Sequence, residues 1–253
     1  MTFVKYEGNP VIAPTPWGDN TDFRDPKVFP FEDGYRMVVG AGQYDVGKIL
    51  LYESKDLIHW DYKSELVSDP RYGACIECPD LFELDGKYVL MFSSIRSLPH
   101  RVCFGVGEFD GESFIPDDPD EPFRAVETGP DFYAPQTFED GSGRRILIAW
   151  MYNWKRSAGA GRTQVGAFTI PRELGLDLAG NVIMLPVEEA MRYTVKESRF
   201  VSYDRGRLRV IFEGKTLIDR PFKDEPELLV LEDVGVVEVF INGGKETITT
   251  YIC

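Results

Sequence analysis

Three stretches of the 253-residue chain follow one pattern, and this internal repeat constrains the fold more than any other feature. They are DPKVFPFEDGYRMVVGAG from Asp25, CPDLFELDGKYVLMFSS from Cys78 and APQTFEDGSGRRILIAWM from Ala134. Each contains a proline, an apolar run, a glycine-containing turn and a second apolar run. The prolines at 26, 79 and 135 are 53 and 56 residues apart. Such a period is typical of a β-propeller with one four-stranded blade per repeat. A β-sandwich with similar hairpins is the alternative, and the matched prolines favour blades.

Short alternating apolar runs between turn residues occupy most of the chain, and they predict an all-β protein. The expected strands lie at 35–42, 46–54, 87–94, 101–109, 144–151 and 162–170. Turns rich in glycine and aspartate separate them. Residues 187–195 are expected to form one or two helical turns, and residues 199–253 contribute further short strands.

Charge and hydropathy exclude several classes of function. Asp and Glu number 42 against 28 Lys and Arg, a net charge of −14, which disfavours nucleic-acid binding. No apolar run is long enough to span a membrane, so no membrane partner is expected. The first residues, MTFVKYEGNP, have neither the basic nor the apolar region of a signal peptide. We therefore expect a cytoplasmic location.

The cysteines and histidines argue against metal and cofactor chemistry. Cys75 and Cys78 form one C-x-x-C, but a zinc site needs a second pair or suitably spaced histidines, and the chain has only His59 and His100. We expect this cysteine pair to pack in the interior. No phosphate-binding glycine loop is present. We expect no metal and no cofactor, and any catalysis would use carboxylates.

The repeat itself predicts where two carboxylates meet. The residues before the three prolines are Arg24-Asp25, Glu77-Cys78 and Tyr133-Ala134, and equivalent positions of blades converge at one end of the propeller axis. Two carboxylates facing one cavity are the arrangement that glycoside hydrolysis uses. Arg24 would keep Asp25 ionised, and the apolar neighbours of Glu77 would favour its protonated form. The alternative is that these acidic residues only flank turns.

Several motifs resemble glycoside hydrolase family 32, the β-fructosidases. They are FRDPKVF (23–29), ECPDLF (77–82), DFYAPQTF (131–138) and RRILIAWMYNW (144–154), supported by KYEGNPVI (5–12), PRELGLDLAGNVIMLPVEE (171–189) and VEVFINGG (237–244). The resemblance implies a five-bladed β-propeller followed by a β-sandwich. It also implies retaining hydrolysis of terminal fructosides such as sucrose, inulin or levan, without metal or cofactor.

The same resemblance assigns roles to individual residues. Asp25 would stabilise the transition state, and Glu77 would be the general acid/base. Arg24 would hold the sugar and orient Asp25. Tyr133 and Trp154 would be walls of the substrate pocket, with packing between blades as the alternative for Trp154. Where the family often has Trp before the Glu-Cys pair, this chain has Ile76.

The chain departs from the family at its N-terminus. It contains no W-M-N-D-P-N-G motif, in which the family's nucleophilic Asp lies, so the nucleophile is unknown. We expect an incomplete propeller over residues 1–180 and a truncated sandwich-like region over 181–253. A homo-oligomer or a separate N-terminal fragment would cover the open blade.

This departure leaves the activity and the substrate open. The isolated chain would be weak or inactive. A non-catalytic fructan-binding or structural remnant is the alternative function. An arabinan-acting glycosidase is a third, which FRDP and ECPDLF disfavour. Sucrose, sucrose 6-phosphate, inulin and levan all remain possible natural substrates.

Overall fold

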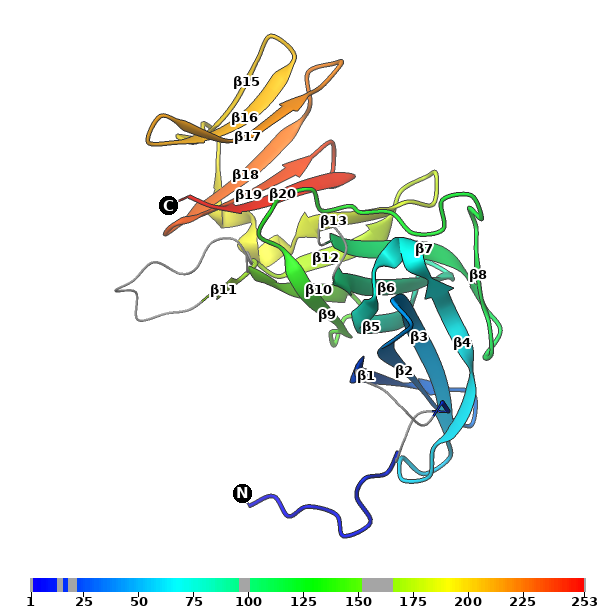
Figure 1. Ribbon diagram of the computed structural model, residues 1–253. Helices are drawn as coiled ribbons and strands as arrows, with labels where there is room; N and C mark the ends of the chain where they lie inside the picture. Colours follow the sequence, from blue (N-terminus) through cyan, green and yellow to red (C-terminus); the bar gives the residue numbers. More distant parts are fainter. Residues whose placement is uncertain (1, 13–15, 18–21, 96–100, 152–165, 253) are drawn as a thin grey trace. The chain divides into compact units, whose positions relative to one another are not determined.

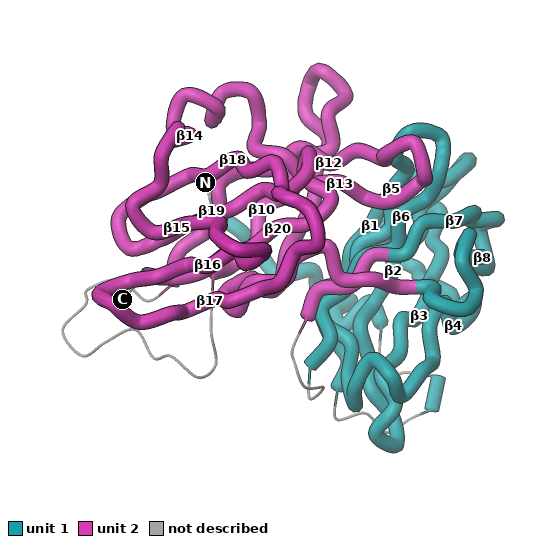
Figure 2. The backbone as a smooth tube through the Cα atoms, turned by 90° about the horizontal axis from the view of Figure 1, so that it is seen from above, with its two compact units in different colours: residues 1–100, 105–122 teal, residues 101–104, 123–253 magenta. Residues whose placement is uncertain are grey.

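The computed structural model describes residues 2–12, 16–17, 22–95, 101–151 and 166–252. It divides into two compact units, residues 1–100 with 105–122 and residues 101–104 with 123–253 (Figure 2). The domain boundary expected after residue 180 stays a prediction. Among the described residues, no helix has the length and apolar character needed to cross a bilayer.

The first sheet of unit 1 is a four-stranded antiparallel meander (Figure 1). Its strands are β1 (Asp22–Phe31), β2 (Gly34–Gln43), β3 (Val46–Ser54) and β4 (Asp61–Asp69). Two-residue turns join β1 to β2 and β2 to β3. The second turn, Tyr44-Asp45, has positive φ at both residues, which is the geometry that matches the twist of a tight hairpin. The expected strands at 35–42 and 46–54 are confirmed.

The second sheet repeats this order. It comprises β5 (Cys75–Leu84), β6 (Lys87–Ile95), β7 (Arg101–Phe109) and β8 (Phe114–Pro116), in the order β5-β6-β7-β8. A short 3-10 turn, η1 (Pro70–Tyr72), precedes β5. The turn Asp85-Gly86 joins β5 to β6, with positive φ at both residues.

The third sheet lies in unit 2 and is centred on β10 (Arg145–Met151). β9 (Tyr133–Glu139) pairs along β10, while β11 (Ala167–Phe168) and β12 (Arg172–Leu176) pair with its two ends. β13 (Val182–Pro186) pairs with β12. In the range 162–170, the part that the structure describes is strand only at β11. The expected helical turns appear as a 3-10 segment, η2 (Glu188–Tyr193).

All three sheets carry the same irregularity at the repeated proline. In each first strand, two residues lie opposite one residue of the neighbouring strand, which is a β-bulge. The bulged pairs are Asp25-Pro26, Cys78-Pro79 and Ala134-Pro135. The residue before each proline has positive φ, 59° at 25, 48° at 78 and 48° at 134. Because proline has no N–H for the ladder, it suits the unpaired position. The repeat is therefore structural as well as sequential.

The C-terminal strands form two sheets packed face to face within unit 2. One sheet has the order β14 (Thr194–Val195), β18 (Leu228–Asp233), β19 (Val236–Ile241), β20 (Glu246–Tyr251). The other has the order β15 (Val201–Asp204), β16 (Arg207–Phe212), β17 (Lys215–Pro221). Leu208 and Val210 of β16 share one core with Val237, Val239 and Ile248 of β19 and β20. The expected fold class, all-β with propeller-type sheets followed by a short sandwich, is confirmed.

The opposite face of β19 and β20 is polar and equally buried. It meets Arg172 of β12, whose side chain is 0% exposed. Arg172 donates to Glu127 at 3.0 Å and to Glu238 at 2.7 Å, and also to the hydroxyls of Thr247 and Thr249. We call Arg172, Glu127 and Glu238 the junction cluster, because it joins the third sheet to the sandwich inside unit 2.

Candidate active site

The first strands of the two sheets of unit 1 lie side by side, in register with the sequence repeat. Arg24 of β1 contacts Glu77 of β5 at 2.9 Å, and the Asp25 carboxylate accepts from the Cys78 N–H at 3.0 Å. Further along, Lys27 pairs with Asp80 at 3.2 Å. All three contacts join residues 53 positions apart, which is the spacing of the first two prolines. Equivalent residues of neighbouring blades therefore meet one to one, as rotation about a common axis requires.

Glycines on β2 allow this close approach. A Cβ built on Gly40 would lie 2.3 Å from the Ile76 carbonyl oxygen, and one on Gly42 would lie 2.2 Å from that of Ala74. Real Cβ atoms do not approach main-chain oxygens so closely, and the β5 backbone has little freedom to retreat. The sequence Gly-Ala-Gly at 40–42 thus positions Glu77 against β1.

Arg24 is placed between two carboxylates. Its Nη1 donates to Glu77, and its Nη2 pairs with Asp22, two residues earlier on the same strand. Burial by itself would lower the pKa of the Arg24 guanidinium, but the hydrogen bond to Asp22 and the nearby Cys75, Asp22 and Glu77 outweigh it and raise that pKa. The positively charged guanidinium thus contacts Glu77 and Asp22. Its expected role in orienting Asp25 stays a prediction.

Asp25 owes its position to the bulge. Its φ of 59° lies in the left-handed region, which Asp tolerates better than most residues. There its Oδ2 accepts the Cys78 N–H and lies 3.6 Å from the Cys78 Sγ. A carboxylate held by a backbone N–H is fixed in place, which suits a group that stabilises a developing positive charge.

The cysteines near these carboxylates are free thiols in the structure. Burial, and then the charge of Asp25, raise the pKa of the Cys78 thiol far above its ordinary value. Burial also raises the pKa of Cys103 to about 12. Neutral thiols are poor metal ligands and poor nucleophiles. Among the described residues, no three His, Cys, Asp or Glu side chains gather as a metal site would require.

Two of the expected site residues lie elsewhere in the chain. Tyr133 is the first residue of β9 in unit 2, buried and paired with Trp150, at the repeat position of Arg24 and Glu77. Trp154 lies outside the described residues. Their assignment as pocket walls stays a prediction, as do the catalytic roles of Asp25 and Glu77.

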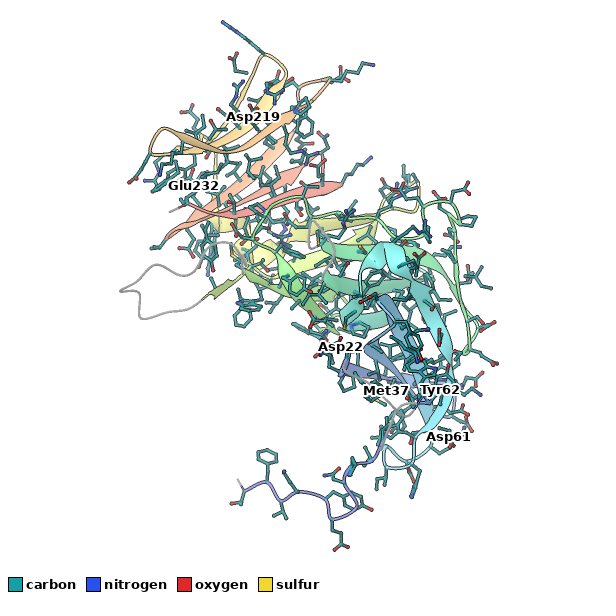
Figure 3. All side chains as sticks on the ribbon, in the orientation of Figure 1. Asp22, Met37, Asp61, Tyr62, Asp219 and Glu232 are labelled. Carbon is teal, nitrogen blue, oxygen red and sulfur yellow. The ribbon has the colours of Figure 1, made fainter. Side chains whose placement is uncertain are left out.

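Asp22 is the group that sequence reasoning missed. It is buried, 4% exposed, and is labelled in Figure 3. The spacing of Asp22 from Arg24 could have indicated this contact. Residues two apart on a strand share a face, and Asp22 precedes Arg24 by two.

Comparison with known proteins gives a consistent result. Residues 1–186 match the family model described as the glycosyl hydrolases family 32 N-terminal domain. A levanase of Bacillus subtilis is 38% identical over 208 residues, covering 74% of this chain and 30% of the levanase. A sucrose-6-phosphate hydrolase of Staphylococcus xylosus is 32% identical over 222 residues, covering 81% of this chain and 44% of that enzyme.

Solved structures agree. A GH32 beta-fructofuranosidase of Bombyx mori is 26% identical with a TM-score of 0.83, covering 98% of this chain and 64% of that enzyme. A mutant of the same enzyme was solved in complex with sucrose, with the same TM-score and 25% identity. The β-fructofuranosidase of Schwanniomyces occidentalis, at 22% identity and a TM-score of 0.77, shares the fold. The chain spans less than two thirds of the length of the first of these relatives, 30% for the levanase and 64% for the Bombyx mori enzyme.

Proposed function

Because this chain belongs to glycosyl hydrolase family 32, we propose that it acts on terminal fructosides and supplies one side of a retaining β-fructosidase site. In this proposal Glu77 is the general acid/base and Asp25 stabilises the transition state. The observation that carries the proposal is the juxtaposition of Arg24 with Glu77 and of Asp25 with Cys78, at the offset of the repeat. The levanase, sucrose-6-phosphate hydrolases and invertase among its relatives support a fructoside as substrate.

The two carboxylates have environments that suit different tasks. Asp25 accepts a main-chain N–H that holds it in one orientation. Glu77 is 16% exposed at its side chain, so substrate and water can reach it, and it bonds to a guanidinium that is itself 36% exposed. A partly exposed guanidinium can leave Glu77 when a sugar enters, which would let Glu77 hold the proton for the leaving group.

Retaining hydrolysis also needs a nucleophilic carboxylate, roughly 5 Å from the acid. The 253-residue sequence contains no W-M-N-D-P-N-G motif to supply it. We propose that the chain by itself turns over fructosides slowly, by attack of water instead of a covalent step. The rate would be about 10³-fold or more below that of a complete enzyme.

We propose that a partner polypeptide carrying that motif supplies the nucleophile, while a second copy of this chain, which has the same sequence, would only cover the open blade. Unit 1 presents apolar side chains to solvent in its first residues, with Phe3 89% and Val4 88% exposed. These exposed side chains support a partner surface at the first residues of the unit. Light scattering tests the oligomer, and a stable 28.7 kDa monomer would contradict it.

Absence of the nucleophile motif favours one alternative, a non-catalytic fructan-binding or structural remnant. Fructose release from sucrose and inulin by the purified chain separates the two. Glu77→Gln and Asp25→Asn should each lower the slow wild-type rate. Glu232→Gln is the matched control, since this carboxylate pairs with Arg199 in the sandwich and should leave the rate unchanged.

Three outcomes are informative. Equal background rates in all four proteins would support the remnant. Rapid wild-type turnover, lost in both site variants, would show that a nucleophile is present after all. Restoration of turnover by a separately expressed fragment carrying W-M-N-D-P-N-G would support completion by an N-terminal partner.

A further inference from the structure

The Arg24 guanidinium bonds to two carboxylates in unit 1, and the proposed mechanism uses only one of them, Glu77. Arg24 binds Glu77 through Nη1 at 2.9 Å and Asp22 through Nη2. The side chain of Asp22 is 6% exposed, that of Glu77 16% and that of Arg24 36%. Asp22 is therefore the most enclosed of the three charges.

The main chain holds Asp22 in this position. Asp22 and Arg24 occupy alternate positions of β1, so both side chains leave the same face of the strand. Their register partners on β2 are Gly42 and Gly40, so no β2 side chain stands beside the two charges at these positions. The backbone of residues 74–76, at and just before the start of β5, lies against these glycines.

Several charged and titratable groups of the described residues lie near Glu77. β1 supplies Asp22, Arg24 and Asp25, and β5 itself supplies the thiols of Cys75 and Cys78. The register partner of Glu77 on β6 is Ser93, which carries no charge. With Asp22 ionised, protonation of Glu77 leaves one anion, Asp22, paired with one cation, Arg24, so the charges of this pair cancel. With Asp22 neutral, the guanidinium would have Glu77 as its bonded anion and would hold Glu77 ionised.

We propose that Asp22 is a positioning residue of this site: it retains Arg24 when Glu77 takes up a proton, and so allows Glu77 to serve as the acid. This inference rests on the proposed role of Glu77 as proton donor. Asp22 need not touch the sugar. It acts through Arg24, by sharing a charge that would otherwise belong to Glu77 alone.

The test follows the carboxyl carbon of Glu77 by ¹³C NMR during a pH titration of the full chain without substrate, with Glu77→Gln to assign the signal. In Asp22→Asn, Glu77 should lose its proton about one pH unit lower than in the wild type. Asp22→Glu, which keeps the charge, should restore the wild-type curve. Arg24→Gln should shift the curve to higher pH, because two anions then face each other without a cation.

Controls separate positioning from folding. Glu232→Gln removes a carboxylate with the same 6% side-chain exposure, paired with Arg199, and should not move the Glu77 curve. If Asp22→Asn does not fold, Asp22→Ser is the second neutral variant. A wild-type Glu77 curve in a folded neutral variant, or a shift to higher pH, overturns the proposal. Because no turnover is needed, the result stays readable even if fructose release is absent in every protein.

Discussion

Two clusters in which one arginine lies between two carboxylates, around Arg24 and around Arg172, have contrasting surroundings. Arg24 bonds to Asp22 and Glu77 in unit 1, with a side chain that is 36% exposed. Arg172 of the junction cluster bonds to Glu127 and Glu238 in unit 2, with a side chain that is 0% exposed. The rings of Phe132 and Phe240 lie 4.9 and 5.0 Å from the Arg172 guanidinium carbon.

This difference shows how burial separates an enclosed ion cluster from one that solvent can reach. Arg172 has two carboxylates, two threonine hydroxyls and two rings around it, so it has nowhere to move. Loss of any partner would leave a charge in a dry interior. Arg24 has an open side, so it can exchange a partner for water or a sugar hydroxyl at little expense. The same arrangement of one arginine and two carboxylates is therefore fully enclosed in unit 2 and partly open to solvent in unit 1.

The largest expected effect comes from removing the buried guanidinium. Arg172→Met should lower the free energy of unfolding by about 3–5 kcal/mol, because Glu127 and Glu238 would remain buried without their cation. Urea unfolding followed by circular dichroism measures it. A loss below about 1 kcal/mol, the range of exposed pairs, would break the contrast between the clusters.

A smaller effect is expected where the two strands of the site approach each other. Gly40→Ala places a methyl group 2.3 Å from the Ile76 carbonyl oxygen and should cost about 1–3 kcal/mol, while moving Glu77 away from Arg24. Gly141→Ala is the matched control, because a Cβ there has nothing within 4 Å. Equal thermal midpoints for the two variants would mean that β5 can shift freely.

The junction cluster should also show a pH dependence. Burial raises the pKa of Glu238 above its ordinary value even though Arg172 opposes the shift. A raised pKa in the folded state means that Glu238 contributes most stability below its unfolded value, and that this contribution is lost as the pH rises through the folded value. The thermal midpoint of the wild type should therefore fall relative to Glu238→Gln from about pH 4 upward. Parallel curves for the two proteins would show that Glu238 stays ionised throughout.

The smallest effect on stability is expected at the open cluster. Arg24→Gln should lower the free energy of unfolding by about 1 kcal/mol, less than at Arg172, since water can reach the freed Glu77 carboxylate although Asp22 stays enclosed. Its effect should appear in function instead, as weaker fructose binding measured by calorimetry. Unchanged fructose binding, together with a stability loss equal to that of Arg172→Met, would contradict the contrast between the enclosed and the open cluster.

Much of the architecture was predictable from local pattern. The spacing of the prolines predicted equivalent strands, and the structure has the same bulge at each. Alternating apolar residues predicted most strands, because the side-chain period of a strand is visible in the sequence. The repeat also predicted that the residues before the first two prolines lie near each other, since rotation about an axis brings equivalent residues together, although it did not predict that Arg24 would contact Glu77.

Only the tertiary structure decided which partner each charged side chain of the site contacts. The bulge interrupts the alternation of β1, so Asp25 turns to the Cys78 N–H while Arg24 points to Glu77 and Asp22. No sequence rule gives the outcome of such an interruption. The junction cluster is harder still to predict from the sequence. Glu127, Arg172 and Glu238 lie far apart in the chain and meet only when two sheets pack. Local pattern determines which strands form, whereas the partner of a buried charge depends on long-range packing that leaves no periodic signal in the sequence.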